Sequence, residues 1–230
     1  MFLTRLLLNP RSAEVRRDLS DAHGMHRRVL TAFADQELES SARREFGALY
    51  RVDETPRGDI SVLVQSSTAP DWTRLPERYL LTTFEPNPAI TELSALERAL
   101  ETKRAFRFRL RANATKRLKA NGEPKRGKRI ELVGPEALLL WLRRKAAPSG
   151  FEIAKREQQG DPNAVETYRL QITEEPKVRG RRRGAQLTFG SSLFEGELVI
   201  TDPPAFSATL RMGLGSAKAY GFGLLSLAPA

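Results

Sequence analysis

The chain has 230 residues and is 40% hydrophobic, enough to bury a sizeable core in one large domain or two small ones, and we favour two. Its 38 Lys and Arg against 28 Asp and Glu give a formal net charge of +10, which is typical of a protein that binds a polyanion. The absence of cysteine excludes disulfides, zinc ribbons and thiol nucleophiles, and no apolar run reaches the length of a membrane span. We therefore expect a soluble cytoplasmic protein that is not exported and has no membrane partner.

The first half of the chain predicts one strand, a helix, two strands, a short helix and a last strand. Phe2 to Leu8 is apolar and stops at Asn9-Pro10, which indicates a buried strand that ends at a turn. Ser12 is a plausible N-cap for the helix, whose apolar spacing is interrupted by SDAHG and resumes at Met25. The remaining strands, the short helix and the last strand are expected at 46–52, 60–65, 71–77 and 79–84.

The second half repeats this order after a charged, helix-prone linker at 91–103. Phe106, Phe108 and Leu110 alternate with three arginines, so this strand should bury one face and present the arginines on the other. Further strands are expected at 130–133, 151–153, 165–172, 187–200 and 224–227, and helices from Pro135 and over 203–212. Both halves thus predict βαββαβ, an α+β fold of two tandem ferredoxin-like domains at residues 1–95 and 104–230.

Positive charge gathers in two clusters of the second half. Residues 104–129 hold eleven Lys or Arg and one acid, and the segment KVRGRRR at 177–183 holds five cations and no acid. A single basic run is often only a solvated face, but two clusters favour nucleic acid. Aromatic stacking motifs for single strands are absent, so we expect contact with a structured backbone such as an RNA stem. The segment 177–183 is interpreted as a flexible arginine loop that can reach phosphates across a groove.

The C-terminal segment 213–230 is rich in glycine around one lysine, Lys218. Such a loop brings backbone N–H groups close to a phosphate and adds a positive charge. A nucleotide-binding protein is an alternative. It fits poorly, because the GxGxxK segment precedes a predicted strand and not a helix.

His23 and His26 are the only histidines of the chain, and spacing i to i+3 in a helix would put both rings on one face. They could be structural, or they could bind a metal with Asp18 or Asp21 as a further ligand. The third interpretation is acid/base cleavage of RNA, in which a 2′-hydroxyl attacks the adjacent phosphate. Two histidines beside Arg27 and Arg28 contain every group that this reaction requires, and it needs no metal.

Six segments form a recognisable set along the chain: Leu8-Asn9-Pro10, Asp18 to His26, Phe108 to Asn113, Trp141-Leu142, Phe194-Glu195-Gly196 and Gly213 to Pro229. The C-terminal segment and FRLRAN are the most specific of them. Together they resemble the CasE family of CRISPR repeat-processing endoribonucleases in the RAMP superfamily, and the resemblance runs from end to end of the chain.

The resemblance implies a metal-independent cut of precursor CRISPR RNA at the base of each repeat hairpin, with no cofactor. It further implies a 5′-hydroxyl and a 2′,3′-cyclic phosphate as the new ends, retention of the product stem, and assembly into the Cascade complex. The family's catalytic histidine falls on His26. Its usual tyrosine falls on His23, so the second catalytic role is open between proton transfer by His23 and mere positioning of the phosphate.

The same resemblance places RNA on the basic surface of the second domain and on the glycine-rich loop. A non-catalytic subunit that binds an RNA stem is the alternative function. The residues expected to bind RNA are Arg27, Arg28, Arg107, Arg109, Arg111, Lys116, Arg117, Lys125, Arg126, Lys128, Arg129, Lys177, Arg179, Arg181, Arg182, Arg183, Gly213, Gly215, Lys218 and Gly221.

Overall fold

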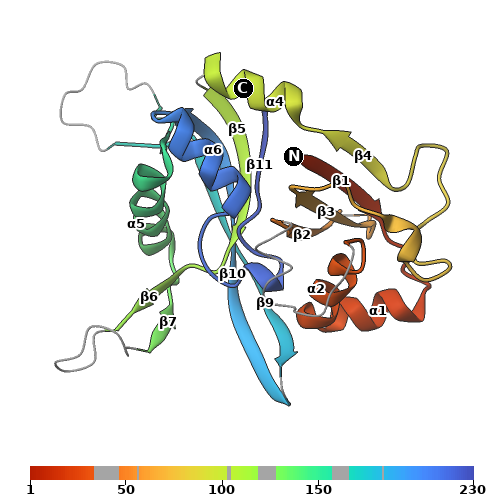
Figure 1. The fold of residues 1–230 in the computed structure, drawn as a ribbon. Helices are drawn as coiled ribbons and strands as arrows, with labels where there is room; N and C mark the ends of the chain where they lie inside the picture. Colours follow the sequence, from red (N-terminus) through yellow and green to blue (C-terminus); the bar gives the residue numbers. More distant parts are fainter. Residues whose placement is uncertain (34–46, 56, 103–104, 119–127, 157–165, 183) are drawn as a thin grey trace.

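The computed structural model describes residues 1–33, 47–55, 57–102, 105–118, 128–156, 166–182 and 184–230. Three of the expected RNA contacts, Lys125, Arg126 and Arg183, lie outside these residues. The side chain of Arg182 is also outside the description. Two antiparallel sheets, each covered by helices, and a two-stranded ribbon formed by 115–117 and 129–131 make up the described fold (Figure 1).

The first sheet has the strand order of a ferredoxin-like domain. Its order is β2-β3-β1-β4, and every neighbouring pair is antiparallel. Two consecutive helices pack on it and bury their apolar side chains against it. The elements are β1 (Phe2–Leu7), α1 (Ala13–Ser20), α2 (Ala22–Leu30), β2 (Leu49–Glu54), β3 (Ile60–Ser66), the 3-10 turn η1 (Trp72–Arg74) and β4 (Ala89–Glu92).

The predicted interruption in the first helix is the junction between α1 and α2. The Ser12 hydroxyl caps α1 by accepting from the backbone N–H of Val15 at 3.3 Å. Asp21 then caps α2 by accepting from the backbone N–H of His23 at 3.1 Å. One predicted helix is therefore two, because Asp21 adopts an extended backbone conformation between them.

The last strand of the first sheet was predicted at 79–84, and that prediction is wrong. Leu80 makes only an isolated bridge to Leu8, and the strand beside β1 is β4. Before β4 begins, the side chain of Asn87 hydrogen-bonds to the edge of β1 at Leu7. Its amide nitrogen donates to the carbonyls of Leu7 and Leu81, and its oxygen accepts from the N–H of Leu7.

The second sheet repeats the ferredoxin order as β11-β5-β10-β8, with β9 alongside β10. Helices α5 and α6 cover one face, and their apolar residues form the second core with the sheet. The two-domain ferredoxin-like fold is thus confirmed. The elements are α4 (Ser94–Thr102), β5 (Ala105–Ala112), β6 (Thr115–Arg117), β7 (Arg129–Glu131), α5 (Pro135–Ala146), η2 (Ala147–Ser149), β8 (Phe151–Ile153), β9 (Leu170–Arg182), β10 (Ala185–Ile200), α6 (Pro203–Met212), η3 (Lys218–Tyr220) and β11 (Leu225–Pro229).

Segment 177–183 was expected to be a flexible loop, and this too needs correction. Strand β9 runs through it to Arg182 and pairs with β10, for example Arg179 with Thr188 and Arg181 with Gln186. Pairing with β10 satisfies the backbone hydrogen bonds, and the cations at 177, 179 and 181 alternate with Val178 and Gly180, so they project from one face of the strand. Lys177, Arg179 and Arg181 are exposed and hereafter form the β9 basic row.

Buried arginines join the two domains. Arg51 of β2 is 3% exposed, pairs with Asp53, and donates to the Arg109 carbonyl at 3.3 Å and the Ser226 hydroxyl at 2.9 Å. Burial lowers the pKa of Arg51, and the charge of Asp53 opposes that shift. These contacts fix one sheet against the other, since they link β2 to β5 and β11.

The glycine-rich loop, residues 213–223, is packed between the two domains. Gly213 has φ +74, and a Cβ there would stand 2.8 Å from the Gly223 carbonyl and 2.8 Å from a methyl of Leu49. Gly221 has φ +84 and packs on the Tyr50 ring, where a Cβ would stand 3.2 Å away. The loop therefore needs glycine for close packing and for its backbone conformation.

We predict that Gly213→Ala lowers the free energy of unfolding by about 3 kcal/mol, because backbone strain and overpacking add. Gly58→Ala is the matched control: its φ is +84, but a Cβ there meets nothing within 4 Å. We expect the control to cost only about 1 kcal/mol. Urea denaturation of both variants measures the difference, and equal losses would contradict the packing role of Gly213.

Candidate functional site

The histidine pair, His23 and His26, lies near the start of α2. The two ring centroids are 6.4 Å apart. His26 is only 5% exposed, and its ring stacks on Tyr50 with centroids 6.2 Å apart. His23 is half-buried, so it is the more accessible of the two. Helical spacing thus brings together two side chains of a type that transfers protons near neutral pH.

Tyr50 is hydrogen-bonded to the first residue of α2. Its hydroxyl donates to the Ala22 carbonyl at 2.9 Å and lies 3.4 Å from the Ala219 carbonyl. Burial raises the pKa of Tyr50, and the negative charge of Asp21 adds to the shift. The hydroxyl therefore stays protonated and serves as a donor between the helix and the C-terminal segment.

The C-terminal end of β9 lies beside the start of α2, the helix of the histidine pair. The same Asp21 oxygen that caps α2 also accepts from the backbone N–H of Arg181 at 2.9 Å. Gly180 is buried at this contact, and a Cβ there would stand 3.5 Å from Asp21. From the sequence, Asp21 was considered only as a possible metal ligand. An aspartate directly before the helix that carries His23 and His26 is also a typical N-cap, and that position was the signal for this role.

The two arginines that follow His26 differ in their surroundings. Arg27 is exposed. Arg28 donates to the buried carboxylate of Asp18 at 2.7 Å and lies 5.1 Å from the Tyr79 ring centroid. Asp18 also accepts from the Tyr79 hydroxyl at 3.1 Å, so its carboxylate is committed to the fold. Among the described residues, no three His, Cys, Asp or Glu side chains gather to hold a metal ion.

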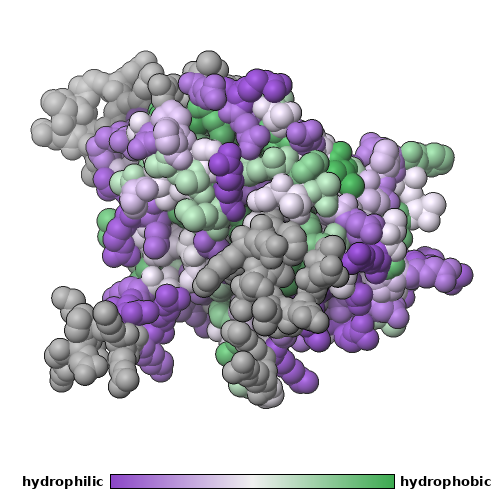
Figure 2. Space-filling model, in the orientation of Figure 1, coloured by the Kyte–Doolittle hydropathy of each residue, from purple (hydrophilic) through white to green (hydrophobic). Residues whose placement is uncertain are grey.

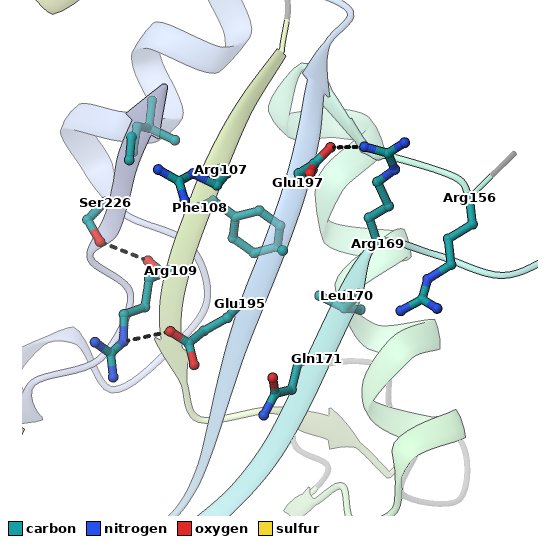
Figure 3. A pocket seen from close by; sticks show the side chains of 13 residues that line it. Arg107, Phe108, Arg109, Arg156, Arg169, Leu170, Gln171, Glu195, Glu197 and Ser226 are labelled. Carbon is teal, nitrogen blue, oxygen red and sulfur yellow. Dashed lines mark hydrogen bonds and ion pairs between the residues drawn. The ribbon is translucent and has the colours of Figure 1, made fainter. Parts of the chain in front are cut away.

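The predicted arginine face of β5 lines a pocket of about 640 Å³ on the open side of the second sheet (Figure 3). Arg109 pairs with Glu195 at 3.3 Å. Arg156 and Arg169 also line the pocket. They were not predicted as RNA contacts, because neither lies in one of the two basic clusters of the sequence. Neither histidine, the side-chain type suited to proton transfer near neutral pH, lines this pocket. We therefore place the candidate reaction site at the histidine pair.

Arg111, the third arginine of this face, is held between the domains. It pairs with both carboxylate oxygens of Glu175 at 2.6 and 2.7 Å and donates to the Val52 carbonyl. Burial raises the pKa of Glu175, but the hydrogen bonds and charge of Arg111 outweigh it and leave that pKa lowered. This position favours a structural role over the expected RNA contact.

The other expected RNA-binding residues are dispersed. The β6–β7 ribbon presents Lys116, Arg117, Lys128 and Arg129 as exposed cations. Lys218 donates to the Met212 carbonyl at 2.6 Å, within the glycine-rich loop. On the face shown in Figure 2, hydrophilic side chains predominate, with hydrophobic patches between them. No helix within the described ranges is long and apolar enough to cross a membrane.

Comparison with known proteins gives end-to-end matches. The family model described as CRISPR associated protein matches residues 1–229. The chain is 38% identical to the CRISPR-associated endoribonuclease Cse3 of Thermus thermophilus, with 100% of both chains covered. It is 29% identical to the CRISPR system Cascade subunit CasE of Escherichia coli, over 91% of this chain and 92% of that one.

A solved structure of the endoribonuclease Cse3 bound to a 19-nucleotide RNA is also similar. Its TM-score is 0.78 at 35% identity, and 100% of each chain is covered. The resemblance drawn from the motifs is confirmed by these matches. Because the family model spans nearly every residue, this chain belongs to the family of CRISPR-associated proteins, in its CasE branch.

Proposed function

We propose that the protein is an endoribonuclease that cuts precursor CRISPR RNA at the base of the repeat stem-loop and keeps the product as a subunit of Cascade. The relatives support this assignment, since one is named an endoribonuclease, one is named a Cascade subunit, and a similar structure holds RNA. We further propose that the reaction needs no metal and takes place in the cytoplasm.

One geometric observation supports the activity most directly. The Asp21 oxygen accepts from the backbone N–H of both His23 and Arg181, so the helix that carries the proton-transfer groups and the strand that carries the basic row meet at one point. A cation row alone would serve binding, and histidines alone would serve many roles. Their meeting favours a cut in the RNA backbone at the edge of the bound stem.

The proposed reaction is an internal transfer at phosphorus. The 2′-hydroxyl attacks the adjacent phosphate, an O2′–P bond forms and the P–O5′ bond breaks. His26 acts as the general acid or base, and His23 assists with the other proton. Arg27, exposed on α2, balances charge on the phosphate. The products carry a 2′,3′-cyclic phosphate and a 5′-hydroxyl.

The stem is held by the β9 basic row. As part of a paired strand, this row offers a fixed edge to a backbone groove, whereas a loop would have to be ordered on binding. The exposed ribbon cations and the arginine pocket extend the positive surface. The glycines of the glycine-rich loop are engaged in packing, so their expected contact with phosphate stays a prediction.

A non-catalytic subunit that binds the RNA stem is the second candidate. It is favoured by one observation: His26 is 5% exposed, so RNA must reach a largely covered ring. RNA with a 2′-deoxynucleotide at the cleavage position distinguishes the two. A nuclease of the proposed type binds this RNA and leaves it intact while cutting the all-ribose form, whereas a binding subunit cuts neither.

We predict that His26→Ala lowers the single-turnover cleavage rate of a cognate repeat RNA by about 10²- to 10⁴-fold, because one proton transfer loses its carrier. RNA affinity in a filter-binding assay should stay within about twofold. Since His26 is buried, a thermal melt must show that the variant folds, and His26→Gln provides a less disruptive second variant. Undiminished cutting by both would contradict the mechanism.

We predict that excess EDTA leaves the cleavage rate unchanged, because protonated groups of the chain supply the charge stabilisation. The measurement is the rate with EDTA compared with added Mg²⁺ at constant ionic strength. A rate that falls with EDTA and recovers with Mg²⁺ would show that cleavage depends on a divalent ion.

We predict that Arg179→Ala with Arg181→Ala flattens the dependence of log affinity on log salt by about one unit for each lost phosphate contact. Titrations of a deoxy-blocked repeat stem at several salt concentrations measure the slope. Arg57→Ala, an exposed arginine in the β2–β3 connection, is the matched control and should leave the slope unchanged. If the double variant keeps the full slope, the stem lies elsewhere.

A further inference from the structure

Tyr220 comes from the C-terminal domain and lies against the histidine pair. It ends the turn η3, which contacts α2 and is part of the blue C-terminal segment in Figure 1. Its ring centroid is 6.4 Å from that of His23, about the same separation as between His23 and His26. His23 therefore neighbours both a second histidine and a phenol that comes from the other domain.

The Tyr220 ring is held firmly. It packs on the Phe189 ring with centroids 4.4 Å apart. On another side, a Cβ placed on Gly180 would stand 3.3 Å from two of its carbons, so the β9 backbone approaches the ring closely. Ala217 precedes η3 at φ +59, and Gly221 follows it at φ +84. The unusual backbone of the glycine-rich loop thus serves to present this side chain.

The Tyr220 hydroxyl differs from those of the chain's three other tyrosines. Tyr50 donates to the Ala22 carbonyl, Tyr79 to Asp18 and Tyr168 to Glu166. For Tyr220, which is half-buried, no partner of the hydroxyl is found among the residues the structure describes. A hydroxyl on a fixed ring at the histidine pair is a donor available to a ligand.

Cleavage of the RNA backbone has a place for such a donor. Negative charge builds up on the non-bridging oxygens as the O2′–P bond forms, and a donor already in position stabilises it without reorganisation. The C-terminal end of β9 meets the start of α2 at the same point, through the hydrogen bond from the backbone N–H of Arg181 to Asp21. A phosphate bound at this junction would lie next to both the histidine pair and Tyr220.

We propose that Tyr220 is a catalytic residue whose hydroxyl donates a hydrogen bond to a non-bridging oxygen of the scissile phosphate. The assignment rests on the proposed endoribonuclease function. Tyr220 keeps its proton throughout: the proton of the 2′-hydroxyl goes to one histidine, and the O5′ leaving group receives its proton from the other. The reaction site is then completed only when the C-terminal domain contributes this side chain.

The test is Tyr220→Phe, which keeps the ring and its packing and removes only the hydroxyl. We expect the single-turnover cleavage rate to fall about a hundredfold, the effect of losing one oxyanion donor. Affinity for the deoxy-blocked repeat RNA and the melting temperature should not change. Tyr168→Phe is the matched control, since it also loses one hydroxyl contact, to Glu166, and should cut at the wild-type rate.

A phosphorothioate at the scissile phosphate separates a direct contact from a structural effect. Sulfur accepts hydrogen bonds weakly, so one of the two diastereomers should slow the wild-type enzyme more than the other. Tyr220→Phe should lose this difference. Wild-type cutting by Tyr220→Phe, an unaltered diastereomer difference, or a loss of RNA affinity or stability would each overturn the assignment. His26→Ala serves as the reference: if it abolishes cutting while Tyr220→Phe does not, the endonuclease proposal stands and only Tyr220 fails.

Discussion

The site depends on one carboxylate oxygen, which belongs to Asp21. It accepts the N–H of His23 and so starts α2, and it accepts the N–H of Arg181 and so anchors β9. A helix N-terminus is a place where negative charge is stabilised, and a capping carboxylate fits both contacts. The helix that carries the histidine pair therefore cannot shift without also moving the C-terminal end of β9.

Local patterns predicted most of the fold. The alternation around Phe108 located β5, and proline marked the starts of α5 and α6, because burial on one face and capping are local properties. The wrong predictions came from contacts with other parts of the chain, which the local sequence pattern does not show. Asn87 binds the edge of β1 in place of a strand, and β9 gains its length by pairing with β10. In KVRGRRR, the alternation of cations with Val178 and Gly180 did indicate a strand, but charge suggested a loop.

The candidate site could be predicted only in part, because it is assembled from both ends of the chain. Helical spacing sufficed to bring His23 near His26. No local pattern links position 23 to Tyr220, since that contact exists only after both sheets have formed and packed together. The resemblance to the CasE family leads one to expect a tyrosine at position 23. The chain has histidine there, and Tyr220 of the glycine-rich loop lies beside it, with ring centroids 6.4 Å apart.

Net charge is a poor guide to where RNA binds, because the cations divide into two groups. Arg28, Arg51 and Arg111 are largely buried and paired with carboxylates. Removing a buried partner typically costs about 3–5 kcal/mol, so these arginines act on folding and domain placement. Exposed cations such as the β9 basic row contribute little to stability and can attract phosphate at long range. The excess charge that suggests RNA binding is thus useful only where the fold leaves the side chains exposed, as it leaves Arg179 and Arg181 on β9.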